Sequence, residues 1–307
     1  MGGRRAIMRV NRAGVNIYVD VRGSQDAAPV VFLHGVTASG TGWDWLPPAV
    51  TADRRIINVD LRGHGRSDRA AGSYVLPEFA DDVLAVLRDV AGTPSVLVGH
   101  SLGGAVAWDI AQRHPELVGA AFLADPPLIP AARGAAAGGT LFATRAATDA
   151  WQRAGLSVAE IAGRLAAAPT GTTLPGTARG LTAADLDLDD AITARAFGLK
   201  HVDVHVLDAA LDGSLLVALD TSAPVAAPVL ILAADPALGS AFSPDHAKLL
   251  TALHPSVEVV RVPGAGHGIH QERAGRPVFT RVLAGFLDRH APRRPAGTRP
   301  AAPELSA

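Results

Sequence analysis

Short apolar runs alternate with segments of helical spacing along most of the chain. The continuous apolar runs predict strands at residues 30–33, 56–59, 95–98, 118–124, 229–233 and 257–262. Apolar residues three and four positions apart predict helices at residues 79–90, 102–113, 244–253 and 278–290. Because strands that are apolar throughout are buried on both faces, the pattern predicts an α/β fold with a mostly parallel, doubly wound sheet.

Three regions depart from this alternation. Residues 8–21 predict an antiparallel entry hairpin about the turn Ala13-Gly14. Residues 126–223 lack strand-like runs but show helical spacing at 151–168 and 190–219, which predicts a helical cap over the carboxyl edge of the sheet. Residues 292–307 are rich in Pro and Ala and predict a disordered tail. The expected organisation is a core of residues 1–125 and 224–291, a cap of residues 126–223, and the tail.

Composition narrows the expected partners and cofactors. The 28 Lys and Arg nearly balance the 29 Asp and Glu, so the net charge gives no reason to expect nucleic acid or a membrane surface as a partner. We expect a small-molecule substrate, and a homodimer is left open. The chain has no cysteine, and no clustered ligand motif predicts a metal or an organic cofactor. Because no apolar run has the length of a signal peptide or a membrane span, the expected location is cytoplasmic.

The most specific motif is Gly99-His100-Ser101-Leu102-Gly103, which has the pattern G-x-S-x-G. It lies between the strand at residues 95–98 and the helix at residues 102–113. A serine in this context occupies a sharp strand-to-helix turn, and its hydroxyl is exposed at the helix N-terminus, where negative charge is favoured. The context favours Ser101 as a nucleophile over a serine that only caps the helix.

Acyl transfer from a serine needs two backbone donors for the oxyanion, one after the nucleophile and one from an early loop. The strand at residues 30–33 runs into His34-Gly35-Val36-Thr37, so Val36 and Leu102 are the expected donors. His34 is expected to shape this loop through hydrogen bonds. The charged block from Asp60 to Asp68 is expected to be structural, because its spacing provides no nucleophile or metal site.

A general base with a pKa near neutrality can take the serine proton and return it to the leaving group. His267 follows the strand at residues 257–262 within a glycine-rich loop and is the expected base, with His270 as its rival. The acid that orients the base should follow a strand on the same edge. Asp235 is favoured because a turn-forming Pro236 follows it, whereas Asp125 precedes Pro126-Pro127 and is the alternative acid.

These motifs, in the chain order serine, acid, histidine, resemble the α/β-hydrolase superfamily, in the group with a His-Gly after an early strand and a helical cap. The resemblance covers about residues 11–125 and 223–290. It implies hydrolysis through an acyl-enzyme, without a cofactor. Ser101 argues against dehalogenases and epoxide hydrolases, because these members of the superfamily use a carboxylate nucleophile.

Substrate choice is expected to depend on the cap and on side chains near the elbow. The candidate pocket residues are His34, Thr37, Trp43, His100, Trp151 and His270. We predict a serine hydrolase that cleaves a carboxylic ester or lactone of a small to medium apolar substrate. A hydrolase of C–C or amide bonds with the same residues, and a ligand-binding receptor on a hydrolase scaffold, are the alternatives.

Overall fold

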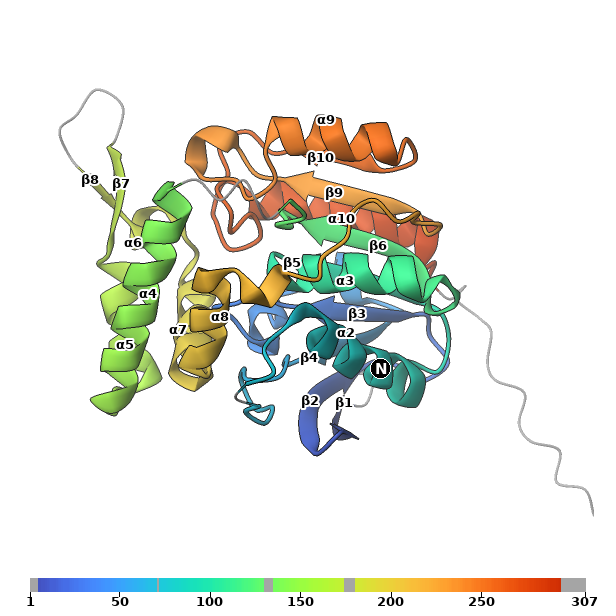
Figure 1. Cartoon of the computed structure of the whole chain (residues 1–307), viewed down its shortest axis with the longest axis horizontal. Coiled ribbons are helices and arrows are strands. Elements are labelled where there is room, and N and C mark those ends of the chain that lie inside the picture. The colour runs from blue at the N-terminus through green and yellow to red at the C-terminus, as the bar shows by residue number, and fades with distance from the viewer. Residues whose placement is uncertain (1–4, 71, 130–134, 174–179, 294–307) are drawn as a thin grey trace, which may run out of the picture.

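The computed structural model describes residues 5–70, 72–129, 135–173 and 180–293. Eight strands form one sheet in the order β1-β2-β4-β3-β5-β6-β9-β10 (Figure 1). The β1–β2 and β2–β4 pairs are antiparallel and all later pairs in the sheet are parallel. The strands are β1 (Arg5–Arg12), β2 (Val15–Arg22), β3 (Pro29–Leu33), β4 (Arg55–Val59), β5 (Ser95–His100), β6 (Val118–Ala124), β9 (Val229–Ala233) and β10 (Glu258–Arg261). The predicted α/β fold and its parallel sheet are confirmed.

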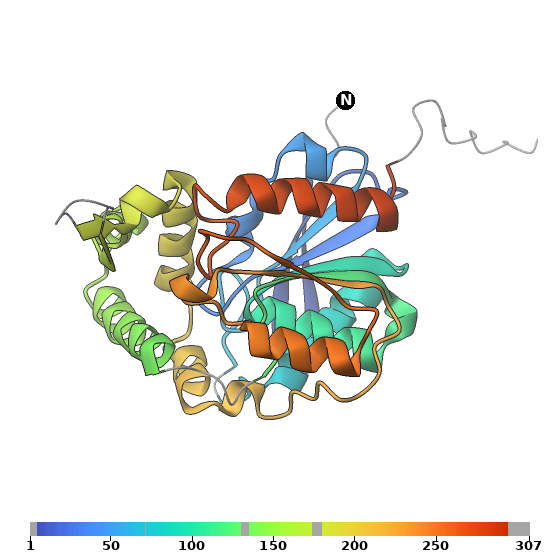
Figure 2. The ribbon, with the colours of Figure 1, turned by 90° about the horizontal axis from the view of Figure 1, so that it is seen from above.

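Helices cover both faces of the sheet (Figure 2). One face carries α2 (Leu76–Val86), α3 (Leu102–Arg113) and α9 (Pro244–Leu253), whose buried residues share one core cluster. The other face carries α1 (Pro48–Thr51) and α10 (Arg276–His290), which pack against each other and share a second cluster. The helix predicted at residues 278–290 begins two residues earlier, at Arg276, and Pro277 fits its first turn.

The two core clusters follow from the side-chain alternation of the central strands. In β3, Val31 and Leu33 belong to the cluster under α2 and α3, whereas Val30 and Phe32 belong to the cluster under α10. All five residues of β3 are buried. Burial on both faces explains why these strands read as continuous apolar runs in the sequence.

The insertion between β6 and β9 is mainly helical. It contains α4 (Ala135–Arg153), α5 (Val158–Ala166), α6 (Ala183–Leu186), α7 (Asp189–His201) and α8 (Val204–Asp212), which lie together beside the sheet (Figures 1 and 2). It also contains the short antiparallel pair β7 (Pro169–Thr173) and β8 (Gly180–Thr182). The expectation that the insertion has no strands is wrong, because the polar Thr and Gly residues of this pair carry no apolar alternation.

Hydrogen bonds fasten the helices of the insertion to the core on at least two sides. Asp203 N donates to Gly63 O at 2.7 Å, and the Tyr74 hydroxyl donates to Asp203 Oδ2 at 2.7 Å. On the other side, Leu188 N donates to Gln271 O at 3.0 Å.

In the described ranges, no helix is both long and apolar enough for a membrane span. The expected tail falls almost wholly on residues 294–307, which lie outside the described residues.

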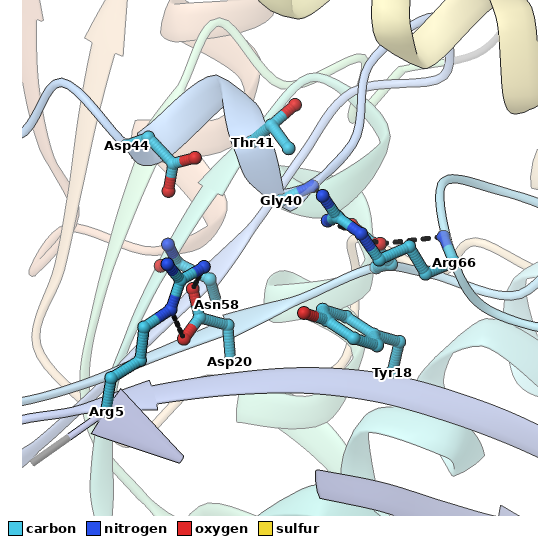
Figure 3. Close-up of a pocket in the computed structure, with 9 residues that line it drawn as sticks. Arg5, Tyr18, Asp20, Gly40, Thr41, Asp44, Asn58 and Arg66 are labelled. Carbon is cyan, nitrogen blue, oxygen red and sulfur yellow. Dashed lines mark hydrogen bonds and ion pairs between the residues drawn. The ribbon is translucent and has the colours of Figure 1, made fainter. Parts of the chain in front are cut away.

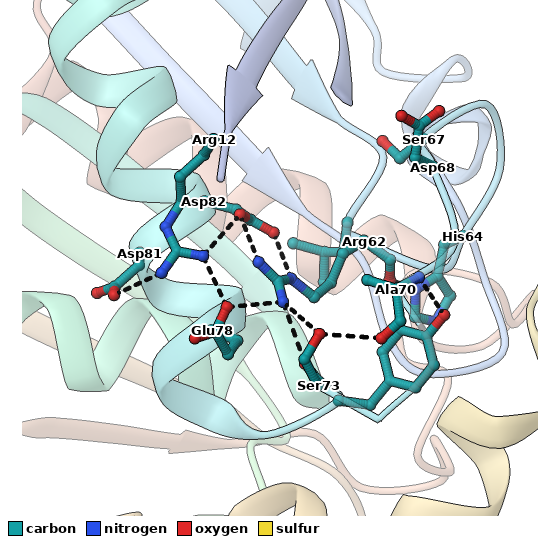
Figure 4. A network of polar contacts seen from close by, with 12 residues as sticks. Arg12, Arg62, His64, Ser67, Asp68, Ala70, Ser73, Glu78, Asp81 and Asp82 are labelled. Carbon is teal, nitrogen blue, oxygen red and sulfur yellow. Dashed lines mark hydrogen bonds and ion pairs between the residues drawn. The ribbon is translucent and has the colours of Figure 1, made fainter. Parts of the chain in front are cut away.

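A buried ion pair holds the turn after β4 against α2 (Figure 4). The Arg62 guanidinium donates to both carboxylate oxygens of Asp82, at 2.6 and 2.8 Å, and both side chains are almost fully buried. Arg62 also donates to Ser73 O at 3.1 Å and contacts Glu78 at 2.8 Å. The expected structural role of the charged block after β4 agrees with this network.

We predict that Asp82→Asn lowers the free energy of unfolding by about 3 kcal/mol, because it removes the buried carboxylate that pairs through both oxygens with the Arg62 guanidinium and leaves only the partly exposed Glu78 beside it. Replacing both partners, as in Arg62→Met with Asp82→Leu, should cost less than this single change. The control is Arg113→Gln, which removes a partly exposed pair with Asp109 and should cost about 1 kcal/mol or less. Urea unfolding at matched m-values measures all three, and equal losses for Asp82→Asn and Arg113→Gln would contradict the prediction.

Candidate functional site

Ser101 occupies a strained turn between β5 and α3. Its φ of 51° and ψ of −116° lie outside the regions that L-residues prefer. Ser101 N donates to Ala124 O at 3.0 Å, which holds the turn against the end of β6. A Cβ on Gly103 would collide with the Leu33 carbonyl, so α3 can begin this close to β3 only with glycine there. The structure therefore has the sharp strand-to-helix turn that the sequence predicts at Ser101.

Three side chains from separate loops form one hydrogen-bonded chain. His267 Nε2 lies 3.0 Å from Ser101 Oγ, and His267 Nδ1 lies 2.7 Å from Asp125 Oδ2. Because a carboxylate only accepts, Nδ1 carries the proton and Nε2 is free to accept from the serine hydroxyl. The His267 side chain is 38% exposed, whereas the Asp125 side chain is fully buried.

The Asp125 carboxylate receives donors from several directions. Besides His267, it accepts from Ala234 N at 3.0 Å, Ser240 Oγ at 2.7 Å and Ala241 N at 2.6 Å. Burial opposes ionisation of Asp125, but the hydrogen bond and charge of His267 and the donors from Ser240 and Ala234 outweigh it and lower its pKa to about 2. The carboxylate is therefore ionised at neutral pH.

Asp235, the acid favoured from the sequence, forms no hydrogen bond with His267 in the structure, so that choice is wrong. Its Oδ1 accepts from Ala237 N at 2.9 Å and its Oδ2 accepts from Gly264 N at 2.9 Å. Asp235 is the N-cap of a short helical turn that begins with Pro236. An Asp followed by Pro at the first helical position is a helix-start signal, and in this chain it marks a cap. The alternative acid, Asp125, takes the place that was expected for Asp235.

The loop after β3 lies directly against the nucleophile turn. A Cβ on Gly35 would lie 3.3 Å from Ser101 Cβ. His34 Nε2 accepts from Leu61 N at 3.0 Å and its Nδ1 lies 2.9 Å from Gly35 O, so this buried ring shapes the loop and does not line a pocket. Among the described residues, neither Val36 N–H nor Leu102 N–H donates a hydrogen bond, which leaves both available to a ligand.

Several residues expected in the pocket instead form a buried aromatic stack. The Trp43 and His270 rings stack with centroids 4.4 Å apart, and His270 meets His100 edge-on at 4.7 Å. His100 Nε2 lies 3.0 Å from His267 O, so His100 holds the loop of that histidine. His270 is buried, which contradicts its candidacy as the base. Burial lowers the pKa of His270 well below its usual value, and the neighbouring His100 contributes.

Of the remaining expected pocket residues, Thr37 lies at the junction with the insertion and Trp151 lies within the insertion. The Thr37 carbonyl lies against Gly198 of α7, and Trp151 is a half-buried residue of α4. Ser240 and Ala241, which donate hydrogen bonds to Asp125, were not predicted from the sequence. No local signal identifies them, because they follow β9 in the chain and meet Asp125 only through the pairing of β9 with β6.

A small polar hollow lies elsewhere, under the turn Gly40–Trp43 (Figure 3). It is lined by Tyr18, Asn58 and Asp60 among others and has a volume of about 10 Å³. This is room for about one water molecule, so the hollow is not a substrate site. In the part of the chain that the structure describes, no group of three His, Cys, Asp or Glu could hold a metal ion.

Known proteins are similar in sequence to parts of this chain. A protein of the AB hydrolase superfamily from Bacillus subtilis is 34% identical over 110 residues, which are 35% of this chain and 38% of that protein. A 2-(acetamidomethylene)succinate hydrolase from Mesorhizobium japonicum is 33% identical over 102 residues, which are 33% of this chain and 37% of that protein. The matched segments thus span less than half the length of these curated relatives.

Two other comparisons cover much more of the chain than these sequence matches do: one with a solved structure and one with a family model. The solved structure of an N-acyl homoserine lactone degrading enzyme is similar to this chain with a TM-score of 0.66 and 26% identity, over 91% of this chain and 100% of that one. The model of the alpha/beta hydrolase family matches residues 30–281. Because that match covers well over half of the sequence, and includes Ser101, Asp125 and His267, the chain belongs to the alpha/beta hydrolase family.

Proposed function

We propose that this protein is a serine hydrolase that cleaves a carboxylic ester or lactone of small to medium size through an acyl-enzyme. The observation that carries the proposal is the hydrogen-bonded chain from Ser101 Oγ through His267 to the buried Asp125. The unused N–H groups of Val36 and Leu102 beside Ser101 support it, because acyl transfer needs donors for an oxyanion. In this proposal Ser101 is the nucleophile, His267 the base and Asp125 the acid.

The first half of the reaction forms the acyl-enzyme. His267 Nε2 takes the Ser101 proton while Oγ bonds to the substrate carbonyl carbon, and the carbonyl electrons move onto oxygen. Val36 and Leu102 donate hydrogen bonds to that oxyanion. When the oxyanion collapses, the bond to the leaving oxygen breaks. His267 gives its proton to that oxygen, which leaves as the alcohol. Asp125 holds the imidazole in the tautomer that this requires.

The second half releases the acid. His267 removes a proton from water, and the water oxygen bonds to the acyl carbon. The second oxyanion collapses, the bond to Ser101 Oγ breaks, and His267 gives the proton back to the serine. No oxidant, reductant or metal is needed at any step, so the residues of this chain are sufficient for the proposed reaction.

The insertion is the proposed roof of the substrate site. Its helix α7 contacts the loop after β3 through Gly198, and Leu188, just before α7, bonds the loop that follows His267. Ligands of open α/β sheets bind at the carboxyl ends of the strands, which is where this roof lies. The similar N-acyl homoserine lactone degrading enzyme supports a lactone among the substrates to be tested.

We predict that Ser101→Ala lowers kcat for a good ester substrate by several orders of magnitude, leaving up to about 10³-fold acceleration over the uncatalysed reaction from the oxyanion donors and binding. A serine-directed phosphonate should add one adduct per chain to the wild-type protein, located at Ser101 by peptide mass spectrometry. The alanine variant should take up none. Full activity of Ser101→Ala would overturn the proposed function.

The assignment of the acid predicts opposite results at two aspartates. Asp125→Asn should lower kcat by about 10⁴, because an amide cannot hold the imidazole in the required tautomer or stabilise its cation. Asp235→Asn should retain most activity, because Asp235 caps a turn and lies outside the hydrogen-bonded chain. Steady-state kinetics on variants with matched melting temperatures decide the matter, and the reverse ranking would return the acid to Asp235.

A substrate panel distinguishes the types of bond that hydrolases with the same serine, histidine and aspartate can cleave. Aliphatic and aryl esters, N-acyl homoserine lactones, aryl amides and vinylogous diketones should be assayed under one set of conditions. We expect kcat/KM for esters or lactones to exceed that for amides and diketones by at least about tenfold, which is about 1.4 kcal/mol in transition-state binding. Preference for the diketones or amides would identify a C–C or amide hydrolase. Stoichiometric binding without turnover would identify a receptor.

A further inference from the structure

Arg195 is a cation of the insertion that lies between the two loops of the proposed site. It belongs to α7, one turn before Gly198, whose added Cβ would lie 2.8 Å from both Thr37 O and Ala38 Cα. At the other end of α7, Asp187 forms an antiparallel bridge with Glu272. Glu272 Oε2 accepts from Gly266 N, the residue before His267, at 2.7 Å. The helix therefore runs from the His267 loop to the Val36 loop, and Arg195 lies between these ends.

Helix geometry places Arg195 on the side of α7 opposite Phe197. The Phe197 ring lies 4.8 Å below the guanidinium of Arg66, and Arg66 also covers Tyr18 of β2. Two residues turn a helix by about 200°, so Arg195 points away from β2. In the sheet order, this direction leads past β3 to β5 and β6, which end at Ser101 and Asp125. Long side chains on a helix lean toward its N-terminus, which here is the His267 loop.

The Arg195 guanidinium has no bonded partner among the described residues. Its Nε is buried without a hydrogen bond, and no ion pair to its side chain is present in the described ranges. The buried guanidiniums of Arg54 and Arg62, in contrast, each donate to a carboxylate at 2.6 Å. Burial lowers the pKa of Arg195, and the charge of Asp187 acts in the opposite direction without bonding it. Arg195 is half-buried overall, and its two terminal nitrogens are not among the buried unbonded atoms, so they can reach a ligand. Because a partly desolvated cation without a bonded partner costs stability, its presence points to a ligand that supplies the counter-charge.

We propose that Arg195 binds a carboxylate of the substrate, so that the enzyme acts on an ester or lactone that carries a second, ionised acid group. This proposal rests on the proposed function and specifies its substrate class. A guanidinium stays protonated and matches the two oxygens of a carboxylate with two parallel N–H groups. The nearby carboxyl groups of Asp187 and Glu272 disfavour a doubly charged phosphate at the same place. The wholly apolar substrate expected from composition is thereby replaced by one with an apolar body and a single negative charge.

The test compares acid and neutral esters of equal length. Monoethyl esters of succinic, glutaric and adipic acids are assayed against ethyl butanoate, pentanoate and hexanoate by acid release in a pH-stat. We expect the wild-type protein to prefer at least one acid ester. In Arg195→Gln, the ratio of kcat/KM between that ester and its neutral match should fall about 10- to 100-fold, the usual range for a hydrogen bond to a charged group. Arg164→Gln, at an exposed arginine of α5, is the matched control and should keep the wild-type ratio.

Calorimetric titration gives a readout that does not depend on turnover. Glutarate should bind wild type and Arg164→Gln more tightly than pentanamide, which has the same length but no carboxylate, and this advantage should disappear in Arg195→Gln. An unchanged ester ratio in Arg195→Gln, or a wild-type protein that binds glutarate no better than pentanamide, overturns the proposal. If the neutral esters are still hydrolysed in that case, the proposed function stands. If no ester is hydrolysed while glutarate binding depends on Arg195, the proposed function fails and the carboxylate site remains.

Discussion

The buried carboxylate of Asp125 is the constraint on which the arrangement of the site depends. A fully buried charge is tolerated only when donors surround it, and here they come from the loop after β9, from the histidine loop and from the end of β9 itself. Asp125 also has a φ of 44°, a conformation that Asp tolerates better than most residues. One side chain thus joins the segments that follow β6, β9 and β10 and fixes the imidazole at the same time.

The stack behind the histidine complements this carboxylate. Trp43, His270 and His100 fill the space under the His267 loop, and the His100 ring meets the backbone carbonyl of His267. Burial and the neighbouring His267 lower the pKa of His100 to about 3, so the ring is neutral near pH 7 and adds no charge beside the base. The His267 loop is therefore held in place by the neutral rings of Trp43, His270 and His100, and the His267 ring by the Asp125 carboxylate.

The substrate side of the site has a different character, because it is built from the insertion. Helix α7 contacts the core through a glycine and through the bridge between Asp187 and Glu272, and it contributes an arginine that the fold itself does not neutralise. The core thus contains the proposed chemistry, whereas the selectivity proposed for this chain resides in one helix. This division fits a fold in which one scaffold serves many substrates.

The sequence by itself determined the sheet, the crossover helices and the nucleophile turn, because apolar runs, helical spacing and the G-x-S-x-G pattern are local signals. It also singled out His267, which lies 3.0 Å from Ser101 Oγ, and Val36 and Leu102, whose N–H groups are the proposed oxyanion donors. It did not decide between Asp125 and Asp235, since both follow strands that end at the same edge. Only the pairing of β6 with β9 brings the donors of residues 240–242 to Asp125, while Asp235 bonds Ala237 and Gly264. The position of Arg195 is likewise a tertiary property, because it depends on how α7 packs across two loops far apart in the chain.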